Sequence, residues 1–223
     1  MPDWPGSTVV MGATFVLIPG AGGDSYYWHL VVPLLEKRGH EVVAVDLPTG
    51  DDSAGLREYA DAVLEAIGDR DDLVLVAQSL GALAAPLACE RADVRLLILV
   101  APMIGAPGET GGECWSQHEG ASEIDVKTTL LHDVPDEVVS DLFARGEPPQ
   151  SHTPFGEPWP LDAWPDVPTR VLAARNDRLF PFEPMRRLAR ERIGVEADAI
   201  DTGHTPALAR PEELAQRLDA YAA

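Results

Sequence analysis

The stretch Asp72-Leu-Val-Leu-Val-Ala-Gln-Ser-Leu-Gly-Ala-Leu-Ala-Ala85 decides how the rest of this chain is organised. Its first part, Leu73 to Val76, is a short apolar run typical of a strand that is buried on both faces. After the turn residues Ala77 to Gly81, a run rich in Leu and Ala predicts a buried helix. A strand, a tight turn with a central Ser and a helix form the arrangement of a nucleophile elbow, in which Ser79 would stand above the sheet.

The turn around Ser79 is crowded, so the residues two before and two after it must be small. Gly81 meets this requirement, and Ala77, where Gly is usual, still fits. The same geometry would direct the backbone N–H of Leu80 into the space above Ser79. The alternative is that Ser79 merely caps a helix, because Ser-x-Gly occurs often by chance, so the rest of the chain has to decide.

Strand-like and helix-like segments alternate on both sides of this stretch. β-branched and aromatic runs predict strands at 14–18, 41–45, 95–100 and 169–174, with a weak one at 196–200. Helical spacing of apolar residues and helix-boundary residues predict helices at 26–38, 53–67, 182–193 and 211–221, with Ser53 as a candidate N-cap. The alternation predicts an α/β fold, in which residues 1–223 form a single domain with a mainly parallel sheet of about six strands and helices on both faces. Ligands bind at the carboxyl ends of the strands in such folds.

Residues 102–166 interrupt this pattern with many Pro and Gly residues, and within them 135–144 is the convincing helix. A long irregular insert in a compact domain is often a lid or binding loop, so we interpret it as an embedded cap over the site. The alternative is a disordered linker, which the five large aromatic side chains of the segment disfavour. The cap is expected to cover an apolar pocket, with contributions from Trp115, Phe143, Trp159 and Trp164.

Two later segments contain residues that could activate Ser79. A serine hydroxyl needs a base within hydrogen-bond reach, and the base needs an acid to orient it. Asp177 directly follows the strand at 169–174, and His204 follows the weak strand just ahead of the final helix. Each of these residues comes just after a predicted strand, and the chain order is Ser, Asp, His. The sequence therefore predicts a catalytic triad of Ser79, Asp177 and His204.

The glycine-rich loop Pro19-Gly-Ala-Gly-Gly23 follows the first strand. A developing oxyanion needs two N–H donors, and the backbones of Ala21 and Leu80 are the predicted ones. Gly20 would let the backbone approach the substrate. A phosphate-binding loop is the alternative, but the loop lacks both G-x-G-x-x-G and the G-K-[ST] of a P-loop. The predicted substrate-binding residues are Gly20, Gln78, Trp115 and Trp159.

The remaining polar residues are expected to have other roles. Asp201 is expected to shape the turn before His204, and the other histidines are expected to be structural or at the surface. Cys114 and His118 form a lone C-x3-H without a second ligand pair, so no metal site and no cofactor are predicted.

The composition narrows the class of protein. With 223 residues, 45% apolar residues and a formal charge of −20, the chain is expected to be globular with an acidic surface. Such acidity disfavours nucleic acid and anionic membranes as partners, which leaves a small-molecule substrate, with the oligomeric state (monomer or homodimer) open. Two cysteines do not make a disulfide framework, no apolar run approaches the roughly 20 residues of a membrane span, and the N-terminus lacks the features of a signal peptide. A cytoplasmic location is the resulting expectation.

The run from Phe15 to Asp46, and above all 23–47, resembles the α/β-hydrolase superfamily, in particular the plant methyl-esterase and hydroxynitrile-lyase group and its bacterial esterase relatives. The segment Pro102 to Glu109 is also similar to that group. The resemblance implies the same triad and oxyanion donors. It departs at Pro19 and Gln78, where the group usually has His, and at Ala77 and Ala82, where Gly is common; none of these changes removes a catalytic group.

The leading hypothesis is a cofactor-free carboxylic ester hydrolase that acts on a small ester, thioester or lactone through an acyl-enzyme. One alternative is a ligand-binding protein of the same fold with weak turnover, and another is a lyase. The resemblance implies that a hydroxynitrile lyase of this group would carry a Lys directly after the catalytic His and a Thr just before the oxyanion residue. Thr205 and Gly20 occupy these positions here.

Overall fold

The computed structural model describes residues 12–117, 125–146 and 148–223. These residues form a six-stranded sheet in the order β2-β1-β3-β4-β5-β6, and every neighbouring pair is parallel. The α/β-hydrolase fold expected from the sequence is confirmed. The strands are β1 (Thr14–Ile18), β2 (Glu41–Ala44), β3 (Leu73–Gln78), β4 (Val94–Val100), β5 (Thr169–Ala174) and β6 (Asp198–Ile200).

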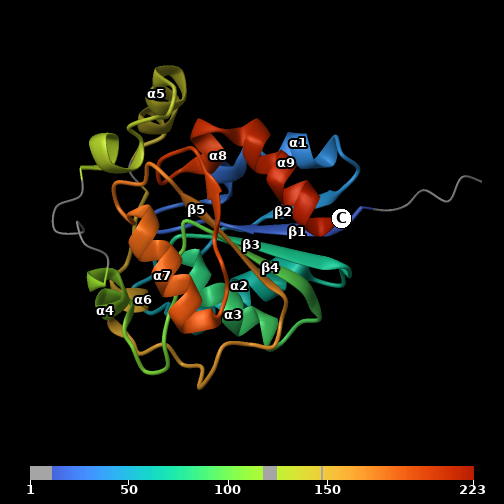
Figure 1. Cartoon of the computed structure of the whole chain (residues 1–223), viewed down its shortest axis with the longest axis vertical. Helices are drawn as coiled ribbons and strands as arrows, with labels where there is room; N and C mark the ends of the chain where they lie inside the picture. The colour runs from blue at the N-terminus through green and yellow to red at the C-terminus, as the bar shows by residue number, and fades with distance from the viewer. Residues whose placement is uncertain (1–11, 118–124, 147) are drawn as a thin grey trace, which may run out of the picture.

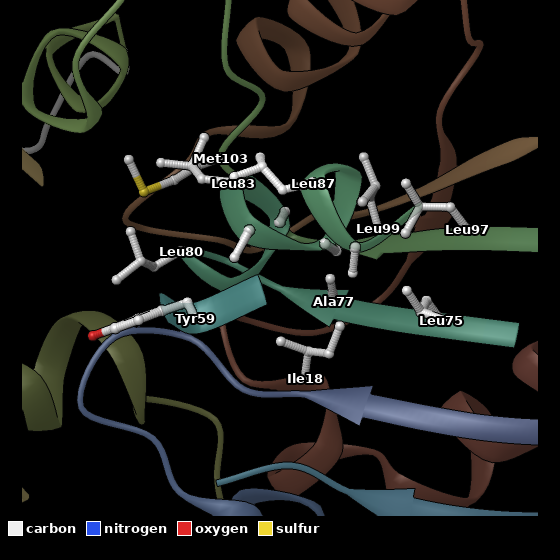
Figure 2. Packing of buried hydrophobic residues seen from close by; sticks show 14 of the residues in the cluster. Ile18, Tyr59, Leu75, Ala77, Leu80, Leu83, Leu87, Leu97, Leu99 and Met103 are labelled. Atoms are coloured by element: carbon white, nitrogen blue, oxygen red, sulfur yellow. The ribbon is translucent and has the colours of Figure 1, made fainter. Parts of the chain in front are cut away.

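β3 lies at the centre of the sheet, between β1 and β4, and all six of its residues are buried. Leu75 and Ala77 face one side and belong to one hydrophobic cluster, whereas Val74 and Val76 face the other side and belong to a second cluster. Figure 2 shows Leu75 and Ala77 among the side chains that pack with those of the helix after β3. Burial on both faces explains why the strand is a continuous apolar run rather than an alternating one.

Helices cover both faces of the sheet (Figure 1). One face is covered by α2 (Leu56–Ile67), α3 (Gly81–Cys89) and α7 (Phe182–Ile193), and the other by α1 (Val32–Glu36), α9 (Pro211–Ala222) and the short η1 (Ser25–Trp28) and α8 (Pro206–Ala209). α3 is buried along its whole length, as its run of Leu and Ala predicts. These helices cover the two faces of the sheet but not the carboxyl ends of its strands, where ligands bind in such folds.

Two helix predictions need correction. The helix expected at 26–38 is two short helices, η1 and α1, because Pro33 has no N–H to continue a helix and is tolerated only in a first turn. Ser53 does not cap α2, whose N-cap is Gly55. The amide and hydroxyl of Ser53 both donate to Asp51 Oδ1, so this Ser completes a turn before the helix.

The insert at 102–166 contains more helix than expected. Besides α5 (Asp136–Ala144), which confirms the predicted helix, it holds α4 (Gly111–Ser116), the π-helical turn η2 (Val126–Leu130) and α6 (Thr153–Gly156). Figure 1 shows α4 and α6 side by side, whereas α5 stands apart from them at the top of the view. The expectation that Phe143 lines an apolar pocket is wrong, since it is 55% exposed on α5. The other three aromatic residues pack against or within the core cluster on the α3 side.

Candidate active site

Ser79 lies at the turn between β3 and α3, with a backbone φ of +49° that non-glycine residues rarely adopt. Its N–H donates to the Val100 carbonyl, and its own carbonyl accepts from Met103 N–H, so backbone bonds hold the strained residue on both sides. A Cβ on Gly81 would lie 2.3 Å from the Pro19 carbonyl oxygen. The small residue that the sequence placed here is therefore required by the close approach of the loop after β1.

His204 brings the three predicted triad residues together. Its Nε2 lies 3.1 Å from Ser79 Oγ, and its Nδ1 lies 2.8 Å from Asp177 Oδ2. All three residues are at most 7% exposed. A carboxylate can accept a hydrogen bond but cannot donate one, so the contact with Asp177 places the imidazole proton on Nδ1. The lone pair of Nε2 then faces the serine hydroxyl.

The backbone fixes the carboxylate of Asp177. Its second oxygen, Oδ1, accepts the N–H groups of Leu179 and Phe180 at 2.8 and 3.0 Å. Asp201, the other acid near His204, forms an exposed ion pair with Arg175 instead. The geometry therefore distinguishes the two acids and assigns the imidazole to Asp177.

The loop after β1 lies against the Ser79 turn. A Cβ on Gly20 would lie 2.9 Å from Ser79 Cβ and 2.2 Å from Gln78 Oε1, so only Gly fits there. Among the described residues, neither Ala21 N–H nor Leu80 N–H has a hydrogen-bond partner. These are the two amides predicted to bind an oxyanion, and that role stays a prediction.

A residue that the sequence analysis did not single out, Gln150 of the cap, holds the same loop. Its Oε1 accepts the Gly22 N–H at 2.8 Å, and its Nε2 donates to the Ser151 carbonyl and to the Tyr59 hydroxyl. Gly22 has a φ of +62°. The next amide, that of Gly23, donates to Gly20 O, so the two amides after Ala21 are occupied within the protein.

Gln78, predicted to bind substrate, contacts His204. Its Nε2 lies 3.2 Å from both the carbonyl oxygen and Nε2 of His204. The carbonyl requires a donor, which assigns the nitrogen of the carboxamide to this side. A donor beside Nε2 is consistent with the tautomer whose lone pair is on that atom, from which it can accept the Ser79 proton.

The two cap residues predicted to bind substrate occupy different places. Trp115 is partly buried and packs edge-on against Phe180, whose ring is edge-on to the His204 ring at 5.0 Å. Trp159 is 3% exposed, donates its Nε1–H to the Leu83 carbonyl and stacks on Trp164. Substrate binding by either Trp stays a prediction.

The other candidate residues have structural contacts. His29 contacts the Tyr26 carbonyl, and His40 pairs with Asp219. Cys114 is buried in α4, and this burial, with the charge of Glu109, raises the pKa of its thiol to about 12, so it is an unreactive thiol at neutral pH. His118 lies outside the described residues. Within the ranges that the structure describes, no group of three or more His, Cys, Asp or Glu side chains could hold a metal ion.

Sequence reasoning missed a contact between the cap and the triad loops. His132 Nε2 lies 3.0 Å from the carbonyl oxygen of Asn176, the residue before Asp177. Asp133 accepts from the Gly203 N–H, directly before His204. The partners are 44 and 70 positions apart in sequence, and no local pattern connects them.

With this geometry established, comparison with known proteins identifies the family. A sequence profile of the alpha/beta hydrolase family matches residues 15–217. The chain belongs to this family. The relatives fit the group that the sequence resembles: a pyrethroid hydrolase of Sphingobium wenxiniae is 28% identical over 93% of this chain and 86% of its own length, and methylesterase 9 of Arabidopsis thaliana is 33% identical over 39% of this chain and 38% of its own.

The solved structure of a pyrethroid hydrolase from Sphingobium faniae JZ-2 superposes with a TM-score of 0.77, covers 94% of this chain and 97% of that one, and is 23% identical. At that identity the likeness concerns the fold. The chain spans little more than a third of the length of the plant relatives it matches. None of the helices in the described part of the chain has the length and apolar character to cross a membrane.

Proposed function

We propose that this alpha/beta hydrolase is a serine hydrolase that cleaves a small carboxylic ester, thioester or lactone through an acyl-enzyme. The observation that carries the proposal is the placement of His204 between Ser79 and Asp177, at 3.1 and 2.8 Å. A buried serine with a base and an orienting acid in reach is the arrangement that activates a hydroxyl as a nucleophile.

The proposed reaction has two halves. Ser79 Oγ attacks the carbonyl carbon while His204 Nε2 takes the hydroxyl proton, and the carbonyl oxygen becomes an oxyanion that Ala21 and Leu80 N–H groups bind. The intermediate collapses, the C–O bond to the alcohol breaks, and His204 returns the proton to that alcohol. Water then attacks the acyl-enzyme with His204 as base, which releases the acid and restores Ser79. Asp177 keeps the proton on Nδ1 throughout.

The relatives support an ester as the substrate class. The two relatives described above are named as a pyrethroid hydrolase and a methylesterase, that is, a hydrolase and an enzyme that cleaves esters. The cytoplasmic location, a small-molecule partner and the extent of the cap over residues 102–166 remain predictions from the sequence.

A lyase on the same scaffold is the second candidate function, and the charges near the site disfavour it. Cyanohydrin cleavage needs a cation close to the departing cyanide, because an unpaired ionic charge in a dry pocket costs far more free energy than an unpaired neutral polar group. Arg175 pairs with Asp201, and Arg178 donates to the Thr128 carbonyl. Thr205, which directly follows His204, donates its hydroxyl to the Leu130 carbonyl. Ester turnover without cyanide release from mandelonitrile is the expected result.

A fluorophosphonate probe and a panel of nitrophenyl esters of graded acyl length test the proposal. The wild type is expected to label stoichiometrically at Ser79 and to turn over at least one ester. Ser79→Ala should lose labelling and roughly 10⁶-fold in kcat, as expected when a triad nucleophile is removed. A folded wild type that neither labels nor hydrolyses any ester would favour the ligand-binding alternative, and Ser79→Ala turnover within tenfold of the wild type would exclude Ser79 as nucleophile.

A further inference from the structure

One segment of the cap, Thr128–Asp133, contacts both loops that carry the base and the acid of the triad. On the acid loop, Arg178 donates to the Thr128 carbonyl at 2.7 Å, and His132 Nε2 meets the Asn176 carbonyl at 3.0 Å. On the histidine loop, the Thr205 hydroxyl donates to the Leu130 carbonyl at 3.0 Å. The segment therefore bridges two loops that belong to different strands of the sheet.

Asp133 makes the closest of these contacts. Its Oδ2 accepts the Gly203 N–H at 2.6 Å and the Thr202 hydroxyl at 2.9 Å. A hydrogen bond to a charged acceptor is about twice as strong as one between neutral groups. The carboxylate thus holds the two residues directly before His204.

Packing around Gly203 leaves the loop little freedom. A Cβ on Gly203 would lie 2.6 Å from Asp133 Oδ1 and 2.7 Å from His132 Nε2. Asp133 Oδ1 is buried and has no hydrogen-bond partner among the described residues. Asp133 is only partly buried, but an unpaired carboxylate oxygen is costly to bury, so the two hydrogen bonds to Oδ2 are what hold this side chain against the loop.

We propose that Asp133 is a positioning residue for His204, so that the cap contributes to catalysis as well as covering the site. The proposal rests on the serine-hydrolase function, in which the His204 ring has to stay between Ser79 Oγ and Asp177 Oδ2. Asp133 fixes the Gly203 amide, which fixes the backbone from which the imidazole projects. A displacement of about 1 Å at a catalytic group lowers the rate about 100-fold, so a loop held less firmly lowers turnover without a change in substrate contacts.

The test compares three variants of the full chain. Asp133→Ala removes both hydrogen bonds, whereas Asp133→Asn keeps one acceptor for the Gly203 N–H in nearly the same volume. Asp136→Asn is the matched control, because Asp136 has the same charge, lies three residues further on and is exposed in the first turn of α5. Nitrophenyl ester kinetics and backbone hydrogen exchange over residues 202–205 are measured for each, with β1 as the internal reference for exchange.

Asp133→Ala is expected to lower kcat about 10- to 100-fold with KM within about threefold, and to accelerate exchange at 202–205 while β1 stays protected. Asp133→Asn should recover most of the rate, and Asp136→Asn should match the wild type. Asp133→Ala turnover and exchange at wild-type levels would overturn the proposal, as would an equal loss in Asp136→Asn. If Asp133→Ala does not fold, an Asp133→Asn variant with wild-type kcat and faster exchange at 202–205 would equally overturn it.

The two proposals fail separately. A wild type without esterase activity or probe labelling contradicts the hydrolase function. Wild-type activity that survives in Asp133→Ala with unchanged exchange contradicts only the role of Asp133.

Discussion

At the residue scale, the triad could be predicted because each member follows the end of a strand. Ser79 stands between an apolar strand and an apolar helix, and Asp177 and His204 follow β5 and β6 within a few residues. In a parallel sheet these ends share one edge, so chain order and strand ends are enough to bring the three together. Side-chain contacts with residues of the cap, such as those of Gln150 and Asp133, have no such rule. They depend on how an irregular segment folds back.

The assignment of the acid gives a direct prediction. Asp177→Asn should lower kcat about 10⁴-fold, because an amide at this position favours the wrong tautomer of His204. Asp201→Asn is the matched control, since Asp201 is exposed and paired with Arg175, and it should stay within about threefold of the wild type. Both are read from nitrophenyl ester kinetics on the folded variants. A larger loss in Asp201→Asn than in Asp177→Asn would transfer the acid role to Asp201.

At the element scale, the sheet followed from the sequence but the short helices did not. Strands that are buried on both faces have continuous apolar sequences, and such runs are evident in β3 and β4. Helices of four to six residues, such as α4 and α6, are too short to show a helical period. α4 begins with a local capping box of Thr110 and Glu113, which the sequence analysis did not use, whereas Glu157, directly after α6, accepts the first N–H of the distant helix α2. That contact joins residues 101 positions apart.

The contact between the cap and the loop after β1 predicts a second effect on rate. Gln150→Ala removes the acceptor for Gly22 N–H, so the loop that carries Ala21 becomes less well oriented for an oxyanion. We expect kcat/KM to fall about tenfold, less than the 10²–10³ that follows loss of an oxyanion donor itself. Tyr59→Phe, which removes only the hydroxyl that Gln150 also contacts, should change kcat/KM less than about threefold. Equal effects of the two variants would show that the Gly22 contact is unimportant.

The ion pair between α7 and the segment after β4 predicts an effect on stability. Arg192 Nη2 lies 2.7 Å from Glu109 Oε1, and both side chains are about 15% exposed. Arg192→Met leaves the Glu109 charge partly buried without its partner, so the free energy of unfolding should fall by about 1–3 kcal/mol in urea titrations. Arg186→Met on the same helix removes a partly exposed partner of the exposed residues Glu183 and Glu196, and it should cost less than about 0.5 kcal/mol. If the two variants lost similar amounts of unfolding free energy, burial of the Arg192–Glu109 pair would not explain its contribution to stability.

At the scale of the whole molecule, the large negative net charge is the property that bears most on substrate choice. The chain carries 37 acidic residues and 17 Lys and Arg, for a formal charge of −20. Many of the Arg residues form ion pairs, as with Arg70 and Glu41 or Arg95 and Asp72. The excess of acidic residues therefore remains as a net negative field around the molecule, which repels anions until salt screens it.

This field predicts how substrate choice depends on ionic strength. A monoester of a dicarboxylic acid is an anion at neutral pH, whereas its diester is neutral, so the pair differs mainly in charge at the same scissile bond. Because the Debye length shortens from about 30 Å at 0.01 M salt to about 8 Å at 0.15 M, kcat/KM for the monoester should rise over this range while that for the diester stays nearly constant. The change should appear chiefly in kcat/KM, because the field acts on the approach of the free substrate. A monoester preferred over its diester at 0.01 M salt, or two esters with the same salt dependence, would show that a local cation at the site outweighs the net charge.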